Sequence, residues 1–259
     1  MTSPDEPALV PTTAPEPASD PVVETSAKPD GKSGTGPSAL PRPGMWARVL
    51  SVGLAAGLIA WACGEAAMIP ETGAGTRGGN TRTLPSVLAS RNAMVSFAIL
   101  GAALGLSLGS AGGMVRRSVR WASLAAVLGL VLGGLTGLAA AQLTLPIYYA
   151  HLQANDLTDS LLVHGGTWTA LGGAAGLAFG WGMGGWGRML RCLLGGAGAA
   201  LLAAVIYEFL GVTLFPLAMT DRPLARTSAV RLLAPLLVAV LAASGALLGA
   251  GRDARAGAR

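Results

Sequence analysis

Long apolar stretches alternate with short polar segments along most of this chain. Six stretches are long enough to predict membrane-spanning helices, because about 20 apolar residues in a helix cross a hydrocarbon layer roughly 30 Å thick. They occupy residues 46–68, 93–113, 121–145, 160–184, 192–215 and 229–251. The fourth is the weakest, since His164, Gly165, Gly166 and Thr167 interrupt its first half. We therefore expect an all-α fold, a polytopic membrane bundle of six helices arranged as three hairpins.

Polar segments flank the six apolar stretches. Residues 1–44 contain no aromatic residue and many Pro, Ser, Thr and Ala residues. Such a composition cannot bury enough apolar surface to offset the entropy lost on ordering, so it predicts a disordered, Pro-rich cytoplasmic tail. The tail could bind a cytoplasmic partner through polyproline conformation, or could be a solvated leader without a ligand. Residues 45–251 form the expected transmembrane domain, and residues 252–259 form a short basic cytoplasmic C-terminus.

Composition narrows the class of protein further. Of 259 residues, 52% are hydrophobic and 12% are charged, whereas roughly 25% are charged in a typical soluble domain. The net charge of +5 does not indicate nucleic-acid binding, because the arginines stand in short groups beside apolar stretches. The expected partner is the lipid bilayer. With two cysteines and two histidines, none at metal-ligand spacing, we expect no metal and no cofactor.

Lysine and arginine are distributed unevenly between the two sides of a six-span bundle. One side holds Lys28, Lys32, Arg42, Arg48, Arg116, Arg117, Arg120, Arg188, Arg191, Arg252, Arg255 and Arg259. The other side holds Arg77, Arg82, Arg91, Arg222, Arg226 and Arg231. Because basic residues concentrate in cytoplasmic segments, this pattern predicts that both termini are cytoplasmic. The abundance of Ala, Gly, Leu and Arg indicates a bacterial plasma membrane.

Glycines recur at every fourth position in several of the stretches. Residues four apart share a helix face, and glycine removes the side chains that keep two backbones apart, so these glycines predict helix-packing surfaces. The residues concerned are Gly101, Gly105, Gly109, Gly113, Gly172, Gly176, Gly180, Gly184, Gly245 and Gly249. Equivalent pairs in the second, fourth and sixth stretches recur 71 and then 69 residues apart. This spacing indicates either a triplicated hairpin or a shared bias toward Gly, Ala and Leu.

Three polar residues within apolar stretches are candidates for function. Glu65, Gln142 and Glu208 each lie near the outer end of an odd-numbered stretch, shortly before a proline. An ionisable group in hydrocarbon costs at least about 2–3 kcal/mol unless it is paired, hydrated or neutral. The three side chains could line an outer vestibule that binds a cation or a proton. Alternatively, the carboxylates are rim groups, with Arg91 or Arg231 as a partner.

Other residues within the stretches are weaker candidates. Trp61 and Trp168 lie several residues inside their stretches and are expected either in packing or in a cavity wall, and His164 is a candidate to face a polar cavity. Ser107 completes a Gly-x-Ser-x-Gly pattern, but a hydrolase nucleophile requires a sharp turn from strand to helix there. Since this segment is predicted as continuous helix, the pattern is attributed to helix packing.

These residues form no catalytic set, so we expect no enzyme. The best-fitting function is a non-enzymatic bundle subunit or scaffold, whose glycine faces pack its helices or join it to a second copy or another membrane protein. The alternative is a small-solute or ion transporter or channel with Glu65, Gln142 and Glu208 at its outer vestibule. An intramembrane enzyme ranks last. Glycine faces buried within one chain would favour a self-contained bundle, and lipid-exposed ones would favour oligomerisation.

Overall fold

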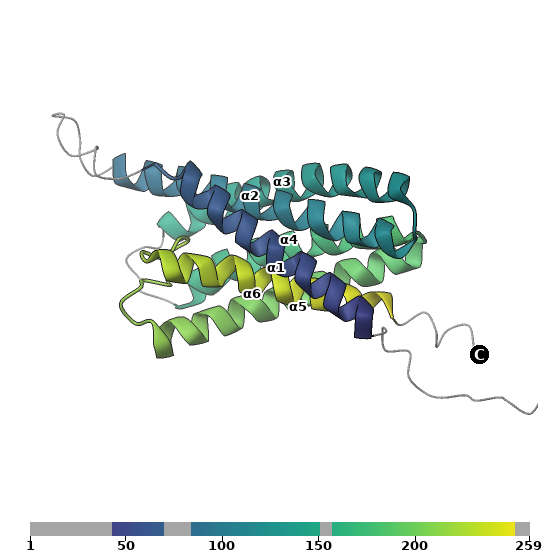
Figure 1. The fold of residues 1–259 in the computed structure, drawn as a ribbon. Coiled ribbons are helices and arrows are strands. Elements are labelled where there is room, and N and C mark those ends of the chain that lie inside the picture. Colours follow the sequence, from purple (N-terminus) through teal and green to yellow (C-terminus); the bar gives the residue numbers. More distant parts are fainter. Residues whose placement is uncertain (1–42, 70–83, 151–156, 252–259) are drawn as a thin grey trace, which may run out of the picture. The chain divides into compact units, whose positions relative to one another are not determined.

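A computed structural model describes residues 43–69, 84–150 and 157–251 of the chain. Six helices account for almost all of these residues, and the described part contains no strand, which confirms the all-α class (Figure 1). The helices are α1 Pro43–Ala67, α2 Leu84–Val115, α3 Val119–Ala150, α4 Leu157–Met183, α5 Trp186–Leu214 and α6 Ser228–Ala250. Helix α1 begins two residues inside the expected tail. The rest of that tail and residues 252–259 lie outside the described residues.

Each helix covers one of the six apolar stretches, and several are longer than the stretch. Helix α2 begins at Leu84 rather than at residue 93, and α3 ends at Ala150 rather than at residue 145. Backbone hydrogen bonding can continue a helix past the hydrocarbon, where apolar side chains are no longer needed. The apolar stretches therefore locate the helices but underestimate their lengths.

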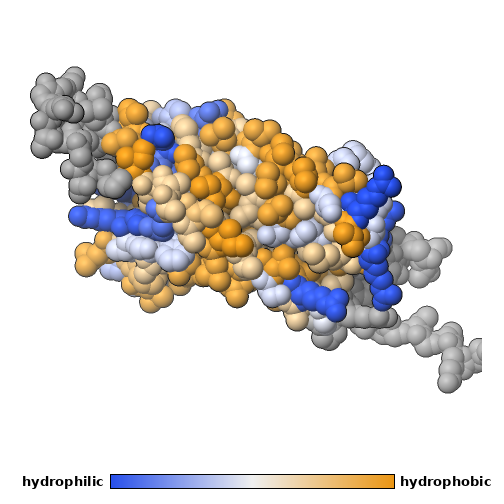
Figure 2. Space-filling view, turned by 45° about the horizontal axis from the view of Figure 1, so that its top comes forward, coloured by the Kyte–Doolittle hydropathy of each residue, from blue (hydrophilic) through white to orange (hydrophobic). Residues whose placement is uncertain are grey.

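Five of the described helices, α1, α2, α3, α5 and α6, are long and apolar enough to cross a membrane. Figure 2 shows hydrophobic residues over the middle of one face, with hydrophilic residues gathered toward its ends. Large exposed apolar side chains on α3 and α5 include Leu124, Val127, Leu135, Leu143, Leu194, Leu202, Phe209 and Val212. Such a surface is suited to lipid contact and is consistent with a membrane protein.

Helix α4 is the one described helix outside this set of five, and it is the most enclosed. It packs against α2, α3, α5 and α6, and Leu171, Ala175 and Phe179 along it are fully buried. Its polar residues His164 and Thr167 are also buried among neighbouring helices. A helix surrounded by protein does not need an apolar outer face, which explains the weak apolar signal of the fourth stretch.

The closest helix pairs are α2 with α3 and α4 with α5, followed by α5 with α6, while α1 packs on α6 and α2. Only residues 116–118 join α2 to α3, and residues 184–185 join α4 to α5. Connections this short make consecutive helices antiparallel neighbours. Gly184 and Gly185 have φ values of +80° and +97°, which side chains disfavour, so this turn depends on glycine. The expected pairs α1–α2, α3–α4 and α5–α6 are also in contact, but all three contacts are less extensive than those of α2 with α3 and α4 with α5.

Glycines of α2 lie directly against the backbone of α3. A Cβ atom added at Gly101 would overlap the carbonyl oxygen of Gly133, and one added at Gly105 would overlap that of Gly129. Further along the same face, Gly109 and Gly113 meet Ala125 and Ala122. The two backbones thus approach as closely as glycine permits.

The glycines of α4 and α6 lie against α5. Added Cβ atoms at Gly172 and Gly176 would overlap the backbone of Gly196 and Cys192, and Gly180 meets Met189. From another side of α5, Gly245 and Gly249 meet Gly195 and Arg191. Gly184 belongs to the α4–α5 turn. The other nine of the ten glycines predicted for helix packing therefore make their contacts within one chain.

Candidate functional site

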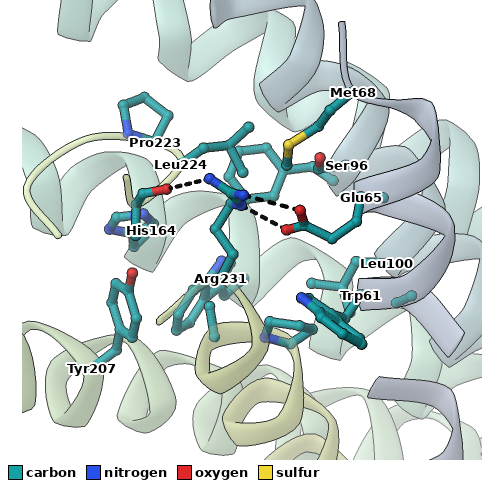
Figure 3. A pocket seen from close by; sticks show the side chains of 17 residues that line it. Trp61, Glu65, Met68, Ser96, Leu100, His164, Tyr207, Pro223, Leu224 and Arg231 are labelled. Atoms are coloured by element: carbon teal, nitrogen blue, oxygen red, sulfur yellow. Dashed lines mark hydrogen bonds and ion pairs between the residues drawn. The ribbon is translucent and has the colours of Figure 1, made fainter. Parts of the chain in front are cut away.

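A cavity of about 60 Å³ lies at the end of the bundle where α1 and α5 end and α2 and α6 begin (Figure 3). This volume is enough for a few water molecules or a small organic molecule. Five helices and the segment before α6 supply its wall. The lining residues are Ala60, Trp61, Gly64, Glu65, Met68, Ser96, Phe97, Leu100, His164, Trp168, Tyr207, Pro223, Leu224, Ala225, Arg231, Ala234 and Pro235.

Glu65 of α1 and Arg231 of α6 form an ion pair in this wall (Figure 3). Arg231 Nε donates to Glu65 Oε1 at 2.6 Å, and Nη2 donates to Oε2 at 2.9 Å. Its third nitrogen, Nη1, donates to the carbonyl oxygens of Ala225 at 3.2 Å and Arg226 at 3.0 Å. Every nitrogen of the guanidinium is thus engaged. Glu65 thus has an arginine partner, which is Arg231 rather than Arg91.

Glu208 of α5 binds two side chains of α4. Its Oε1 lies 2.6 Å from His164 Nδ1 and accepts a hydrogen bond of 2.6 Å from Ser160 Oγ. His164 is 3% exposed and Glu208 12% exposed, so the group is largely removed from solvent. A Ser-His-acid catalytic triad requires the serine hydroxyl on the imidazole nitrogen distant from the acid. Here serine and histidine share one carboxylate oxygen, and the arrangement fixes the imidazole without activating a nucleophile.

Three aromatic rings form the part of the wall between α4 and α5. The ring centroids of His164, Trp168 and Tyr207 lie 5.2 Å apart in each of the three pairs. Trp168 and Tyr207 are buried, at 1% and 2% exposed. Tilted and edge-on rings at this separation attract one another, so the cluster stiffens this side of the cavity.

Three polar atoms in the cavity wall have no hydrogen-bond partner within the described part of the chain. They are Trp61 Nε1, Ser96 Oγ and Trp168 Nε1, and all three are buried atoms. An indole nitrogen can only donate, and a serine hydroxyl can donate or accept. Each buried group left unsatisfied costs about 1–3 kcal/mol. Three such groups therefore lie close to this end of the bundle, and each lowers the stability of the packing around it.

Of the three polar residues predicted for a vestibule, only Glu65 is among the described residues that line the cavity. Glu65 lines the cavity, and Glu208 lies one residue behind the wall, bound to His164. Gln142 is exposed on α3 and does not line the cavity. Helix α3 packs mainly on α2 and α4 and away from the α1–α6 contact, which explains why Gln142 is not part of the cavity wall. Trp61 and Trp168, expected either in packing or in a cavity wall, and His164, a candidate to face a polar cavity, are among the lining residues.

Sequence reasoning missed Ser160, Ser96, Tyr207 and Asn92. Ser160 stands four residues before His164, a spacing that places both on one helix face and could have indicated their common partner. Asn92 is buried and joins α2 to the end of α1. Its Oδ1 accepts from Ile69 N at 3.2 Å, and its Nδ2 donates to Ile69 O at 3.1 Å. A polar residue within or beside an apolar stretch is the sequence feature that generally indicates such a hydrogen bond between helices.

Within residues 43–69, 84–150 and 157–251, no group of three or more His, Cys, Asp or Glu side chains could hold a metal ion. The cavity wall offers apolar contact, hydrogen-bonding groups and the charges of Glu65 and Arg231. The chain matches no protein-family model, no curated protein and no solved structure.

Proposed function

We propose that this chain is a non-enzymatic, six-span membrane protein that binds a small solute in the cavity and carries it across the membrane. One observation carries the proposal: a cavity of about 60 Å³ between five helices is lined mostly by apolar side chains and contains the Glu65–Arg231 ion pair and His164 in its wall. Ligand sites in proteins combine a mostly apolar wall with a few convergent polar groups, as this cavity does.

A proline in α6 adds support for a transport site. Pro235 lines the cavity inside α6 and has no N–H, so the carbonyl of Arg231, four residues earlier, loses its usual partner in the helix. Transporters commonly place their sites at such interrupted helices. The backbone beside Pro235 also meets α1, since a Cβ added at Gly57 would lie 3.0 Å from the Pro235 carbonyl oxygen. Helices α1 and α6 are therefore the elements proposed to move.

The proposed orientation places both termini in the cytoplasm and the cavity toward the outer face of a bacterial plasma membrane. The distribution of lysine and arginine supports it. In this arrangement α4 is the sixth span, shielded from lipid by its neighbours. A solute would enter the cavity from outside, near the starts of α2 and α6.

The scaffold function is the second candidate. Its distinguishing feature would be glycine faces open to a partner, whereas nine of the ten predicted packing glycines meet other parts of the same chain. That use supports a self-contained bundle.

Reconstitution into liposomes tests the transport proposal. Light scattering after rapid mixing would follow the entry of urea, glycerol, acetamide, acetate and methylammonium, each compared with protein-free liposomes. We expect at least one of these solutes to enter faster when the protein is present. Equal rates for every solute in the two preparations would contradict transport.

A further inference from the structure

A hollow lies at the opposite end of the bundle from the cavity, where α2 and α4 end and α3 and α5 begin. Its volume is about 310 Å³, at the lower end of the roughly 300–1,000 Å³ of ligand clefts in proteins. Its wall includes Arg116, Trp121, Trp181 and Trp186, together with the glycines of the α4–α5 turn. One arginine and three tryptophans thus border a single hollow at the surface.

The guanidinium of Arg116 is held in this wall by contacts that leave its nitrogens available. Its Cζ atom lies 4.7 Å from the centroid of the Trp121 ring, an attractive cation–π contact. A Cβ atom added at Gly184 would lie 3.3 Å from Arg116 Nη1, so the side chain reaches from the α2–α3 turn to the α4–α5 turn. Within the described part of the chain, no acceptor forms a hydrogen bond with its nitrogens. The guanidinium can therefore donate to a bound group.

The charge around the hollow is positive. Residues 84–150 and 160–207, which form α2, α3 and most of α4 and α5, contain no Asp or Glu. The arginines at and beside the two turns are Arg116, Arg117, Arg120, Arg188 and Arg191. A guanidinium binds phosphate oxygens through charge-assisted hydrogen bonds. The hollow is therefore complementary to an anionic group such as a phosphate diester.

An exposed apolar stripe leads away from the hollow along α5. Trp186, Leu190 and Leu194 stand four residues apart on one helix face and are 74%, 44% and 68% exposed. On α3, Leu124 follows Trp121 by three residues and is also exposed. Both helices are long and apolar enough to cross a membrane, so these leucines are suited to contact acyl chains. A ligand in the hollow would meet an arginine at one end and apolar side chains at the other.

We propose that the hollow binds an anionic phospholipid such as phosphatidylglycerol, with the phosphate on Arg116 and one acyl chain along α5. The three tryptophans suit the level of the lipid headgroups, because tryptophan concentrates at the membrane–water interface. Basic pockets between membrane helices on the cytoplasmic side bind anionic headgroups, and this end is the one proposed to be cytoplasmic. The apolar stripe favours a lipid over a free phosphate. This site is separate from the cavity and does not depend on transport.

Native mass spectrometry of the full chain in detergent tests the site. Bound lipid is counted as phosphatidylglycerol, which is anionic, or phosphatidylcholine, which is zwitterionic, is added with the same acyl chains. Arg116→Gln removes the guanidinium from the hollow. Arg120→Gln is the matched control, because Arg120 is exposed at the same end and does not line the hollow. Both changes remove one positive charge.

We expect the unaltered chain to bind one phosphatidylglycerol at least about tenfold more tightly than phosphatidylcholine, through charge-assisted hydrogen bonds to Arg116. Arg116→Gln should weaken phosphatidylglycerol binding about tenfold and leave phosphatidylcholine binding unchanged. Arg120→Gln should change phosphatidylglycerol binding by less than about threefold, the effect of one exposed charge.

Three outcomes would overturn the proposal. Equal affinity of the unaltered chain for the two lipids would show that the hollow does not select an anionic headgroup. Equal weakening by Arg116→Gln and Arg120→Gln would attribute binding to the general positive charge of this end. Displacement of phosphatidylglycerol by an equal concentration of glycerol 3-phosphate would identify a soluble phosphate compound, not a lipid, as the occupant. Transport is judged separately, by the liposome rates.

Discussion

Glu65 and Arg231 show how a charged residue is accommodated within an apolar stretch. Two hydrogen bonds, of 2.6 and 2.9 Å, join the side chains, which are 26% and 20% exposed respectively. The pair links α1 to α6 beside the cavity. Removing one member leaves the other charge partly buried and alone, which is more costly than removing both.

Glu65→Gln should lower the unfolding free energy by about 1–3 kcal/mol, the range for a hydrogen-bonded charge, with partial exposure favouring the lower end. Adding Arg231→Gln should restore part of that loss, because no unpaired charge remains. Denaturation of the four proteins of this cycle in mixed micelles measures the coupling. Strictly additive losses would contradict a functioning ion pair.

Glu208 offers a second test, because it is an acceptor for two buried groups. Glu208→Gln keeps an amide oxygen for Ser160 and His164, so we expect a loss below about 1 kcal/mol. Glu208→Leu removes the acceptor of both groups and should cost about 2–6 kcal/mol, from two unsatisfied groups. Denaturation in the same micelles compares the two variants. Equal losses would mean that the hydrogen bonds to Ser160 and His164 do not contribute.

At the scale of single residues, the sequence identified which side chains are candidates for function, but it did not identify the residues that they contact. The cost of a charge in hydrocarbon led to two alternatives for Glu65, a vestibule site or a rim carboxylate with an arginine partner. It could not choose between Arg91 and Arg231, because the choice depends on how α2 and α6 are rotated. The direction in which Gln142 points could not be predicted either. Apolar residues of α3 face both lipid and protein, so no pattern of apolar and polar positions marks the inner face of this helix.

At the scale of the helix, the contact between α2 and α3 depends on glycine. Gly105→Ala would place a methyl group onto the Gly129 carbonyl and push the two backbones apart. We expect a loss of about 1–3 kcal/mol, the usual cost of overpacking. Gly198→Ala in α5 is the matched control, because an added Cβ there meets nothing within 4 Å. It should be neutral or stabilising by up to about 1 kcal/mol.

Unfolding midpoints of the two variants, measured under the same conditions, decide this prediction. Similar midpoints for Gly105→Ala and Gly198→Ala would contradict close backbone packing between α2 and α3. The four-residue glycine spacing was visible in the sequence, but the helix on the other side of each contact was not. The short turns at residues 116–118 and 184–185 select α2–α3 and α4–α5 as the closest pairs.

For the whole molecule, length and hydrophobicity were enough to predict a helical membrane protein. They could not predict that α4 is enclosed by four other helices, because the weak apolar signal of a central span resembles that of a segment outside the membrane. The interruption by His164 and Thr167 reflects burial among helices. Side-chain placement around the cavity required the packing of five helices and was not accessible from sequence.

Cysteine labelling tests the proposed topology, in which α4 is a span. In a Cys63→Ser, Cys192→Ala background, Asp221→Cys should react with a membrane-impermeant maleimide in intact cells. Gly187→Cys, exposed at the start of α5, should react only after permeabilisation. Labelling of Gly187→Cys from outside would mean that α4 does not cross the membrane, and it would contradict the six-span orientation.

The cavity as the route of the solute is the central claim, and two leucine substitutions on α1 test it most directly. Ala60 lines the cavity, and Ala62 is exposed on the same helix, so both changes add the same volume at different places. The measurement is the entry rate, into proteoliposomes, of a solute carried by the unaltered protein. We predict that Ala60→Leu reduces it to the protein-free rate and that Ala62→Leu leaves it unchanged. Unaltered entry with Ala60→Leu, or equal loss with both, would contradict the claim.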